Sequence, residues 1–145
     1  QGAYRIPIKR KKKYVENQLQ IKCVRWFKRN YKHALIWSSL NGVQATARQK
    51  SDWKKEGLLK GVPDLQVLYQ DKTIFIELKR PKTYKKSKAT GNRIIKDSGG
   101  TTSKEQDEFI LIAEGFGHKC YVVDTLEDFK KIIILHLGVD GGIKV

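Results

Sequence analysis

The sequence is poor in the residues that build disulfide scaffolds and zinc sites. It has 2 Cys among 145 residues, and Cys23 and Cys120 stand far apart with no ligand partner at zinc spacing. This excludes a disulfide-rich scaffold and a zinc-finger type of site, so both thiols are predicted to be reduced. The three histidines, His33, His118 and His136, form no local ligand pattern either.

Long apolar runs and targeting signals are also missing. No stretch approaches the roughly 20 apolar residues that cross a bilayer, and no signal-peptide pattern opens the chain. The chain also lacks a glycine-rich loop of the kind that cradles phosphates. We therefore expect a cytoplasmic protein with no membrane association and no small-molecule cofactor.

Acidic residues are scarce relative to basic ones. The chain has 30 Lys and Arg against 15 Asp and Glu, a formal net charge of +15, while 39% of its residues are hydrophobic. This composition excludes a disordered basic tail and predicts a folded domain that binds a polyanion, of which nucleic acid is the commonest. The imbalance is local, because residues 1–100 hold 25 basic and 7 acidic residues, whereas residues 101–145 hold 5 and 8.

Two segments carry most of the excess charge. Lys9–Lys13 is an unbroken basic run, and Lys79–Lys96 contains eight basic residues and no acidic one. Either can be a solvated stretch without a partner or a surface that contacts phosphates. We expect residues 80–101 to form a connection without secondary structure, and connections of that length are usually functional or disordered.

Apolar periodicity and helix-end signals predict alternating helices and strands, hence an α/β fold. Gly57 is expected to close the second helix, Thr102 or Ser103 to cap the third, and Asn41-Gly42 to form a turn after a short buried strand. The expected organisation is a basic arm at residues 1–13, one domain at 14–137 and a tail at 138–145. The predicted helices are Tyr14–Arg29, Ala45–Glu56, Ser103–Glu114 and Thr125–Leu135, and the predicted strands are Ala34–Ser38, Asp64–Tyr69, Thr73–Lys79 and His118–Val123.

The two middle strands form a predicted hairpin that gathers charged side chains on one face. With a turn centred on Asp71 and Lys72, Asp64 pairs with Lys79, and Glu77 lies diagonally from Asp64 at roughly 7 to 8 Å. Two carboxylates at that spacing can meet on one Mg²⁺ ion through metal–oxygen bonds of about 2 Å. The alternative is that this face is the solvent side of a half-exposed hairpin, where such pairs are ordinary.

The motif that contains these carboxylates resembles a known nuclease signature. Gly61-Val62-Pro63-Asp64, followed by Glu77-Leu78-Lys79, is similar to the PD-(D/E)XK pattern. The flanks resemble the VRR-NUC (virus-type replication-repair nuclease) branch, through Glu16 in the first helix and a Ser-x-x-Gln helix start at Ser103. The resemblance covers about residues 15–129 and implies a restriction-endonuclease-like core, with a mixed central sheet flanked by helices. The basic segment at residues 80–102 departs from it, because the family would have a shorter connection there.

The resemblance also implies a chemical role for each motif residue. Asp64, Glu77 and the main-chain carbonyl of Leu78 would hold Mg²⁺ or Mn²⁺, which neutralises the scissile phosphate and activates a water. Lys79 would orient or deprotonate that water, or offset charge in the transition state.

Two further residues have competing interpretations. Glu16 is implied to be a ligand of a second metal or an outer-shell group, but its place beside an apolar stripe also fits a rim residue. Gln106 is implied to act in the site by bonding Lys79 or a phosphate, but it can simply complete a helix capping box.

The remaining basic residues are interpreted as contacts to the phosphates of the substrate, which bind DNA without recognising its sequence. The implied activity is metal-dependent, structure-selective cleavage of DNA, most of all of four-way (Holliday) junctions, by a homodimer of phage or prophage type in a bacterial cell. Flap or nick cleavage and a noncatalytic DNA-binding module are the alternatives. The residues assigned to DNA binding are Lys9, Arg10, Lys11, Lys12, Lys13, Arg48, Lys60, Arg80, Lys82, Lys85, Lys86, Lys88, Arg93, Lys96, Ser103 and Lys104.

Overall fold

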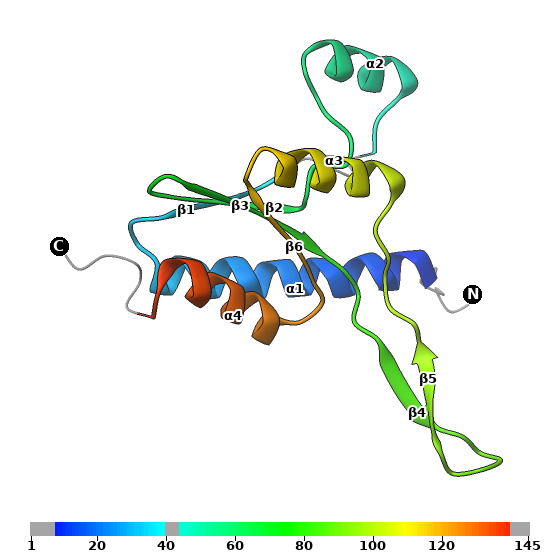
Figure 1. Cartoon of the computed structure of the whole chain (residues 1–145). Coiled ribbons are helices and arrows are strands. Elements are labelled where there is room, and N and C mark those ends of the chain that lie inside the picture. The colour runs from blue at the N-terminus through cyan, green and yellow to red at the C-terminus, as the bar shows by residue number, and fades with distance from the viewer. Residues whose placement is uncertain (1–7, 40–43, 140–145) are drawn as a thin grey trace, which may run out of the picture. The chain divides into compact units, whose positions relative to one another are not determined.

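The structure is a computed structural model that describes residues 8–39 and 44–139 (Figure 1). The predicted alternation of helices and strands is present, and the predicted turn at Asn41-Gly42 lies outside the described residues. The helices are α1 (Ile8–Asn30), α2 (Ala47–Lys55), α3 (Lys104–Gly115) and α4 (Leu126–Leu137). The strands are β1 (Leu35–Ser38), β2 (Leu65–Tyr69), β3 (Lys72–Leu78), β4 (Thr83–Lys86), β5 (Arg93–Asp97) and β6 (Lys119–Val123).

The chain divides into two compact units that interleave along the sequence. The first unit contains α1, residues Leu78–Thr101 with the hairpin β4–β5, and the segment from Val122 through α4. The second unit contains residues Ala34–Glu77 and Thr102–Tyr121, with β1, α2, β2, most of β3, and α3. No helix in the described part of the chain is both long and apolar enough to cross a membrane.

A four-stranded sheet has the strand order β1-β2-β3-β6, and β1, β2 and most of β3 belong to the second unit. β2 is antiparallel to both β1 and β3. Leu65, Val67, Ile74 and Ile76 lie on one face of the β2–β3 pair and are almost completely buried. β1 was expected to be buried, but Leu35 is 61% exposed. The strand lies at the edge of the sheet, where only one side has a neighbouring strand to cover it.

The β2–β3 hairpin is present, but its predicted register is wrong by two residues. Tyr69 pairs with Lys72, so the turn is Gln70-Asp71. Gln70 adopts a φ of 52°, in the left-handed region that glycine or asparagine usually occupies in tight turns. The shift preserves which side chains share a face, because it moves each partner by an even number of residues.

The helix α3 covers the polar face of this hairpin. Phe109 of α3 packs edge-on against Phe75 of β3, with ring centroids 5.0 Å apart. On the same face, two residues along β3, Glu77 is only 2% exposed. The alternative of a solvent-facing hairpin surface is therefore wrong, and Glu77 is a buried carboxylate.

In the first unit, aromatic residues join α1 to α4. The ring of Trp26 contacts those of Tyr31 and Phe129 edge-on, at centroid distances of 5.6 Å and 6.0 Å. The Tyr31 hydroxyl donates a 2.7 Å hydrogen bond to the carbonyl of Gly138, just after α4 ends. Helix α1 begins at Ile8, six residues before the predicted start, because lysine and arginine favour helices and do not interrupt one.

Residues 80–101 contain secondary structure, contrary to the prediction. β4 and β5 form an antiparallel hairpin with an irregularity between Thr83 and Tyr84. The guanidinium group of Arg93 lies 3.9 Å over the ring of Tyr84. At the base of the hairpin, Arg80 donates two hydrogen bonds, of 2.7 and 2.8 Å, to the carboxylate of Asp97. The sequence did not predict this hairpin, because its lysine-rich strands show little alternation of apolar and polar residues.

Both cysteines are free, as predicted. Burial raises the pKa of Cys23 to about 12. Partial burial, with a smaller contribution from the charge of Glu114, raises the pKa of Cys120 to about 11. Both thiols therefore stay protonated near neutral pH, and the thiolate is the reactive form.

We expect both thiols to react slowly with a disulfide reagent in the native protein at pH 8. Unfolding in urea should make both reactive, since it removes the burial that raises their pKa values. The rate of thiol modification measures this. Rapid modification of two thiols per native chain would contradict the buried, protonated state.

Candidate active site

The loop before β2 is fixed by hydrogen bonds to one proline carbonyl. The Pro63 carbonyl accepts from the hydroxyl of Ser39 at 3.0 Å and from the side-chain amide of Gln66 at 3.0 Å. The backbone amide of Ser39 also donates to the carbonyl of Asp64 at 3.0 Å. These bonds fix the backbone at Pro63 and Asp64, so the Asp64 side chain starts from a defined position just before β2.

The corrected register brings the two carboxylates closer than the sequence indicated. Leu65 pairs with Ile76, and continuing that register by one residue places Asp64 opposite Glu77. The backbone amide of Asp64 donates a 3.2 Å hydrogen bond to Oε2 of Glu77. The predicted pairing of Asp64 with Lys79 is wrong, since β3 ends at Leu78 and Lys79 bonds through its backbone amide to the carbonyl of Val123.

Gln106 completes the predicted capping box and also contacts Glu77, a partner that the sequence did not indicate, while its predicted bond to Lys79 or a phosphate stays a prediction. Its Oε1 accepts a 2.8 Å bond from the backbone amide of Ser103, and its own backbone amide donates to the Ser103 hydroxyl, which completes the capping box of α3. Its Nε2 donates a 2.6 Å bond to Oε1 of Glu77. Because the capping box occupies Oε1, the amide group presents its donor side to the carboxylate.

A buried carboxylate is costly unless polar groups compensate it. The two oxygens of Glu77 accept from the Asp64 amide and the Gln106 side chain respectively. Glu77 is thus held by the start of α3 and by the loop before β2 together. This arrangement fixes the position of the group instead of leaving it mobile in solvent.

A close backbone contact keeps the start of α3 against that loop. Gly61 has a φ of +84°, and a Cβ atom there would lie 2.2 Å from the carbonyl oxygen of Glu105. Only glycine fits this contact, because it lacks the Cβ and readily adopts a positive φ. Gly61 therefore allows the approach that brings Gln106 to Glu77.

The α2 helix provides a matched control for the role of Gln106. Thr46 and Gln49 form the same capping box there. We expect Gln106→Ala and Gln49→Ala each to lower the free energy of unfolding by about 1 kcal/mol through loss of the capping box. Only Gln106→Ala should also lower the DNA cleavage that the sequence motif predicts, by about 10- to 100-fold, because it removes the side chain that orients Glu77, the predicted metal ligand.

Urea unfolding and cleavage rates measured on both variants test this expectation. Equal losses of cleavage in the two variants would show that Gln106 acts only through helix stability.

Glu16 and Lys79 belong to the first unit. Glu16 lies in α1 and is partly buried, and its charge contributes to the raised pKa of Arg80, whose principal cause is the hydrogen bond to Asp97. The side chain of Lys79 passes close to Gly100, where a Cβ would lie 3.3 Å from its Cδ. The structure thus brings together Asp64, Glu77 and Gln106, while the roles of Glu16 and Lys79 in the site stay predictions.

The residues assigned to DNA binding fall on several elements. Lys9–Lys13 lie within α1, Arg48 lies in α2, and Lys60 directly precedes Gly61. Ser103 caps α3, and its hydroxyl accepts a helix-end hydrogen bond. The guanidinium group of Arg80 is engaged by Asp97 at the base of the β4–β5 hairpin. The exposed basic residues of the segment that forms the hairpin are Lys82, Lys85, Lys86, Lys88, Arg93 and Lys96.

The donor set suits a hard divalent cation. Asp64 and Glu77 offer carboxylate oxygens, and the carbonyl of Leu78 follows Glu77 directly in the chain, which matches the oxygen ligands that Mg²⁺ prefers. Within the described ranges, no group of three or more His, Cys, Asp or Glu side chains is placed to hold a metal.

Comparison of the sequence with protein families and with curated proteins gives no match. A solved structure described as a "VRR_NUC domain protein" matches the fold with a TM-score of 0.61, over 90% of this chain and 97% of that chain. The chain has the VRR_NUC fold. This confirms the predicted fold class, and because the identity is 18%, the likeness concerns the fold.

Within the VRR_NUC fold of this chain, sequence reasoning missed the residues that support the carboxylates. Gln66 lies on the same face of the hairpin as Glu77, but no recognised motif includes Gln66 or Ser39. The alternation that placed Gln66 beside Glu77 was the available signal for one of them. Nothing in the sequence indicated that both would bond to the carbonyl of Pro63.

Proposed function

We propose that the protein is a metal-dependent nuclease that cleaves DNA. The observation that carries the proposal is the buried carboxylate of Glu77, held opposite Asp64 by two hydrogen bonds at the end of a VRR_NUC-type hairpin. Burying an acidic side chain costs stability unless polar groups compensate it, and an apolar side chain would pack this face at a lower cost. A metal site needs such a fixed carboxylate.

Asp64 and Glu77 would hold Mg²⁺ or Mn²⁺, assisted by the Leu78 carbonyl. When bound, the ion neutralises the scissile phosphate and lowers the pKa of a bound water. Gln106 keeps the carboxylate of Glu77 oriented. Lys79 is proposed to orient or deprotonate the attacking water or to stabilise the developing charge, and Glu16 to assist as an outer or second-metal ligand.

The proposed substrate is branched double-stranded DNA, above all a four-way junction. The chain is highly basic, with a net charge of +15, and its exposed β4–β5 hairpin offers a cationic surface without a sequence-reading motif. Such a surface recognises phosphates and shape. A homodimer would match the two symmetric strands that are cut in a junction, and a phage or prophage enzyme would work in the bacterial cytoplasm.

A cleavage panel tests the proposed function. The purified protein is incubated with labelled four-way junction, flap, nicked and linear DNA, in Mg²⁺, Mn²⁺ or EDTA. We expect cleavage of branched DNA with either metal and none in EDTA. No cleavage of any substrate with either metal, despite DNA binding, would indicate a noncatalytic module instead.

The basic hairpin makes a separate prediction. Replacing Lys82, Lys85, Lys86 and Lys88 with alanine should weaken DNA binding, and should lower the slope of log affinity against log salt by up to about 0.9 per lost phosphate contact. A matched variant replaces Lys22, Lys28, Lys32 and Lys131, which are exposed elsewhere in the first unit. Equal slopes for the two variants would make the hairpin an ordinary solvated surface.

A further inference from the structure

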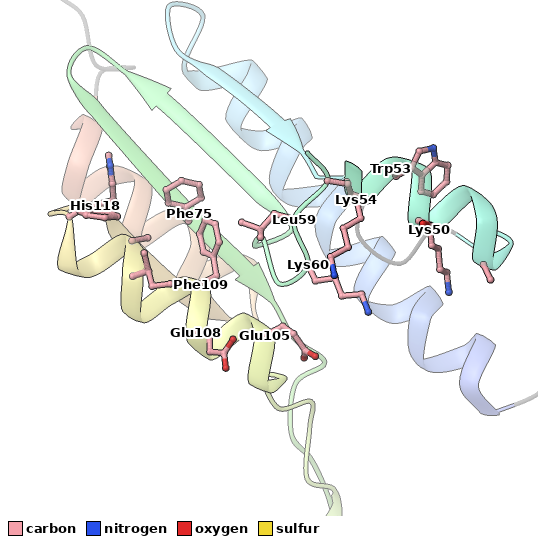
Figure 2. A pocket seen from close by; sticks show the side chains of 16 residues that line it. Lys50, Trp53, Lys54, Leu59, Lys60, Phe75, Glu105, Glu108, Phe109 and His118 are labelled. Carbon is pink, nitrogen blue, oxygen red and sulfur yellow. The ribbon is translucent and has the colours of Figure 1, made fainter. Parts of the chain in front are cut away.

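The second unit contains a large groove beside the carboxylate site. It has a volume of about 990 Å³ and is lined from α2, the loop after α2, β3 and α3 (Figure 2). A groove of this size accommodates several linked rings instead of a single small ion.

One side of the groove is apolar and aromatic. Leu59, Phe75 and Phe109 gather at its centre in Figure 2, and His118 lies further along. Phe116 also lines it and is 79% exposed, an unusual state for a phenylalanine ring. An exposed apolar surface with polar edges is typical of a binding site.

The charges at the edges of the groove are separated by sign. Lys50 and Lys54 lie one turn apart on α2, and Lys60 follows in the next loop. Glu105 and Glu108 line the α3 side (Figure 2). A ligand with an anionic backbone would therefore run along the α2 side, with its apolar parts turned toward the aromatic rings.

The groove and the carboxylate site share two backbone segments. Lys60 is followed by Gly61, which touches the carbonyl of Glu105. Glu105 in turn precedes Gln106, the residue that binds Glu77. A polymer in the groove would thus meet the same two backbone segments that position the carboxylates.

We propose that this groove binds a single-stranded segment of DNA with its bases unstacked. The bases would lie against Phe109 and Phe116, and the phosphates along Lys50, Lys54 and Lys60. The proposal deepens the proposed nuclease function and rests on it for the identity of the polymer. It adds that, among branched DNAs, those with an unpaired segment next to the branch point gain contacts in the groove that a fully paired four-way junction gains only where base pairs open.

The aromatic lining favours a single strand over a duplex. In a duplex, each base face is covered by its neighbours, so aromatic side chains cannot stack on it without disrupting the helix. In a single strand the faces are open, and each base stacked on an aromatic side chain adds binding energy without regard to sequence. Lysines alone would bind a duplex and a single strand through phosphates.

Fluorescence anisotropy of labelled oligonucleotides in EDTA tests the proposal, because binding is then measured without cleavage. The probes are an oligothymidine and an abasic strand of equal length, which carries the same phosphates without bases. Phe116→Ala is compared with Leu111→Ala, an exposed apolar residue of α3 that does not line the groove. Lys54→Ala is compared with Lys55→Ala, its neighbour outside the groove.

We expect Phe116→Ala to weaken oligothymidine binding on the order of 10-fold, and abasic-strand binding hardly at all. Lys54→Ala should weaken both, and the two control variants neither. Equal affinity of the wild type for both strands, or equal effects of Phe116→Ala and Leu111→Ala, would overturn the proposal.

Sedimentation tests whether a second copy of the chain, and not DNA, occupies the groove. Dimers that dissociate on Phe116→Ala, without base-dependent binding, would assign the groove to self-association and overturn the proposal. A protein that cuts no DNA but binds oligothymidine with this dependence on Phe116 and on the bases would contradict the proposed nuclease function. It would still support single-strand binding in the groove.

Discussion

Replacing Glu77 with glutamine should lower the rate of DNA cleavage on the order of 1,000-fold, the largest effect expected of any single substitution. The change removes the negative charge that would hold the cation. It also replaces one of the two carboxylate oxygens, which now accept from the Asp64 amide and from Gln106, with an NH₂ group. One of these donors would then face another donor. Single-turnover cleavage of labelled branched DNA measures the loss.

Asp71→Asn is the matched control for this variant. Asp71 lies in the turn of the same hairpin and is exposed. It should cleave like the wild type, and both variants should bind DNA as tightly as the wild type. A Glu77→Gln protein that cleaves within a few-fold of the wild type would exclude Glu77 as a principal metal ligand.

Replacing Gly61 with alanine should have the largest effect on stability. The added Cβ would lie 2.2 Å from the Glu105 carbonyl oxygen, and the φ of +84° disfavours any residue with a side chain. We expect a loss of about 3 kcal/mol in the free energy of unfolding, from backbone strain and from displacement of the start of α3. Cleavage should fall as well, because that displacement moves Gln106 away from Glu77.

Gly57→Ala separates strain from the steric clash. Gly57 also has a positive φ, of +102°, but no atom lies within 4 Å of an added Cβ. Its alanine variant should lose only the roughly 1 to 2 kcal/mol of left-handed backbone strain and keep its cleavage rate. Urea unfolding of both variants measures the difference. Equal losses would mean that the contact between Gly61 and Glu105 is unimportant.

Features that depend on nearby residues were predictable from the sequence. Ser103, one of the two predicted caps of α3, does cap that helix, whereas Thr46 and Thr125 cap α2 and α4 at positions that the predicted helices Ala45–Glu56 and Thr125–Leu135 included. The faces of the β2–β3 hairpin also followed from alternation. Its register did not, because the turn contains Gln70 in a conformation that its residue type does not indicate.

Features that depend on contacts between distant segments were not predictable. The hydrogen bond from Gln106 to Glu77 joins residues 29 positions apart and requires α3 to cover the face of β3. The β4–β5 hairpin is held by Arg80 and Asp97 at its base, and not by an apolar pattern that a sequence displays. The motif thus singled out Asp64 and Glu77 as candidates, while the structure shows which hydrogen bonds position them.

Asp64 and Glu77 are proposed to hold the divalent cation with which this protein cleaves DNA. Titration of Mn²⁺ into the protein, with free Mn²⁺ followed by electron paramagnetic resonance, measures this binding without a cleavage assay. We expect the wild type and Asp71→Asn to bind Mn²⁺ equally, and Glu77→Gln and Asp64→Asn to lose this binding. Unchanged Mn²⁺ binding in both carboxylate variants would contradict this proposal.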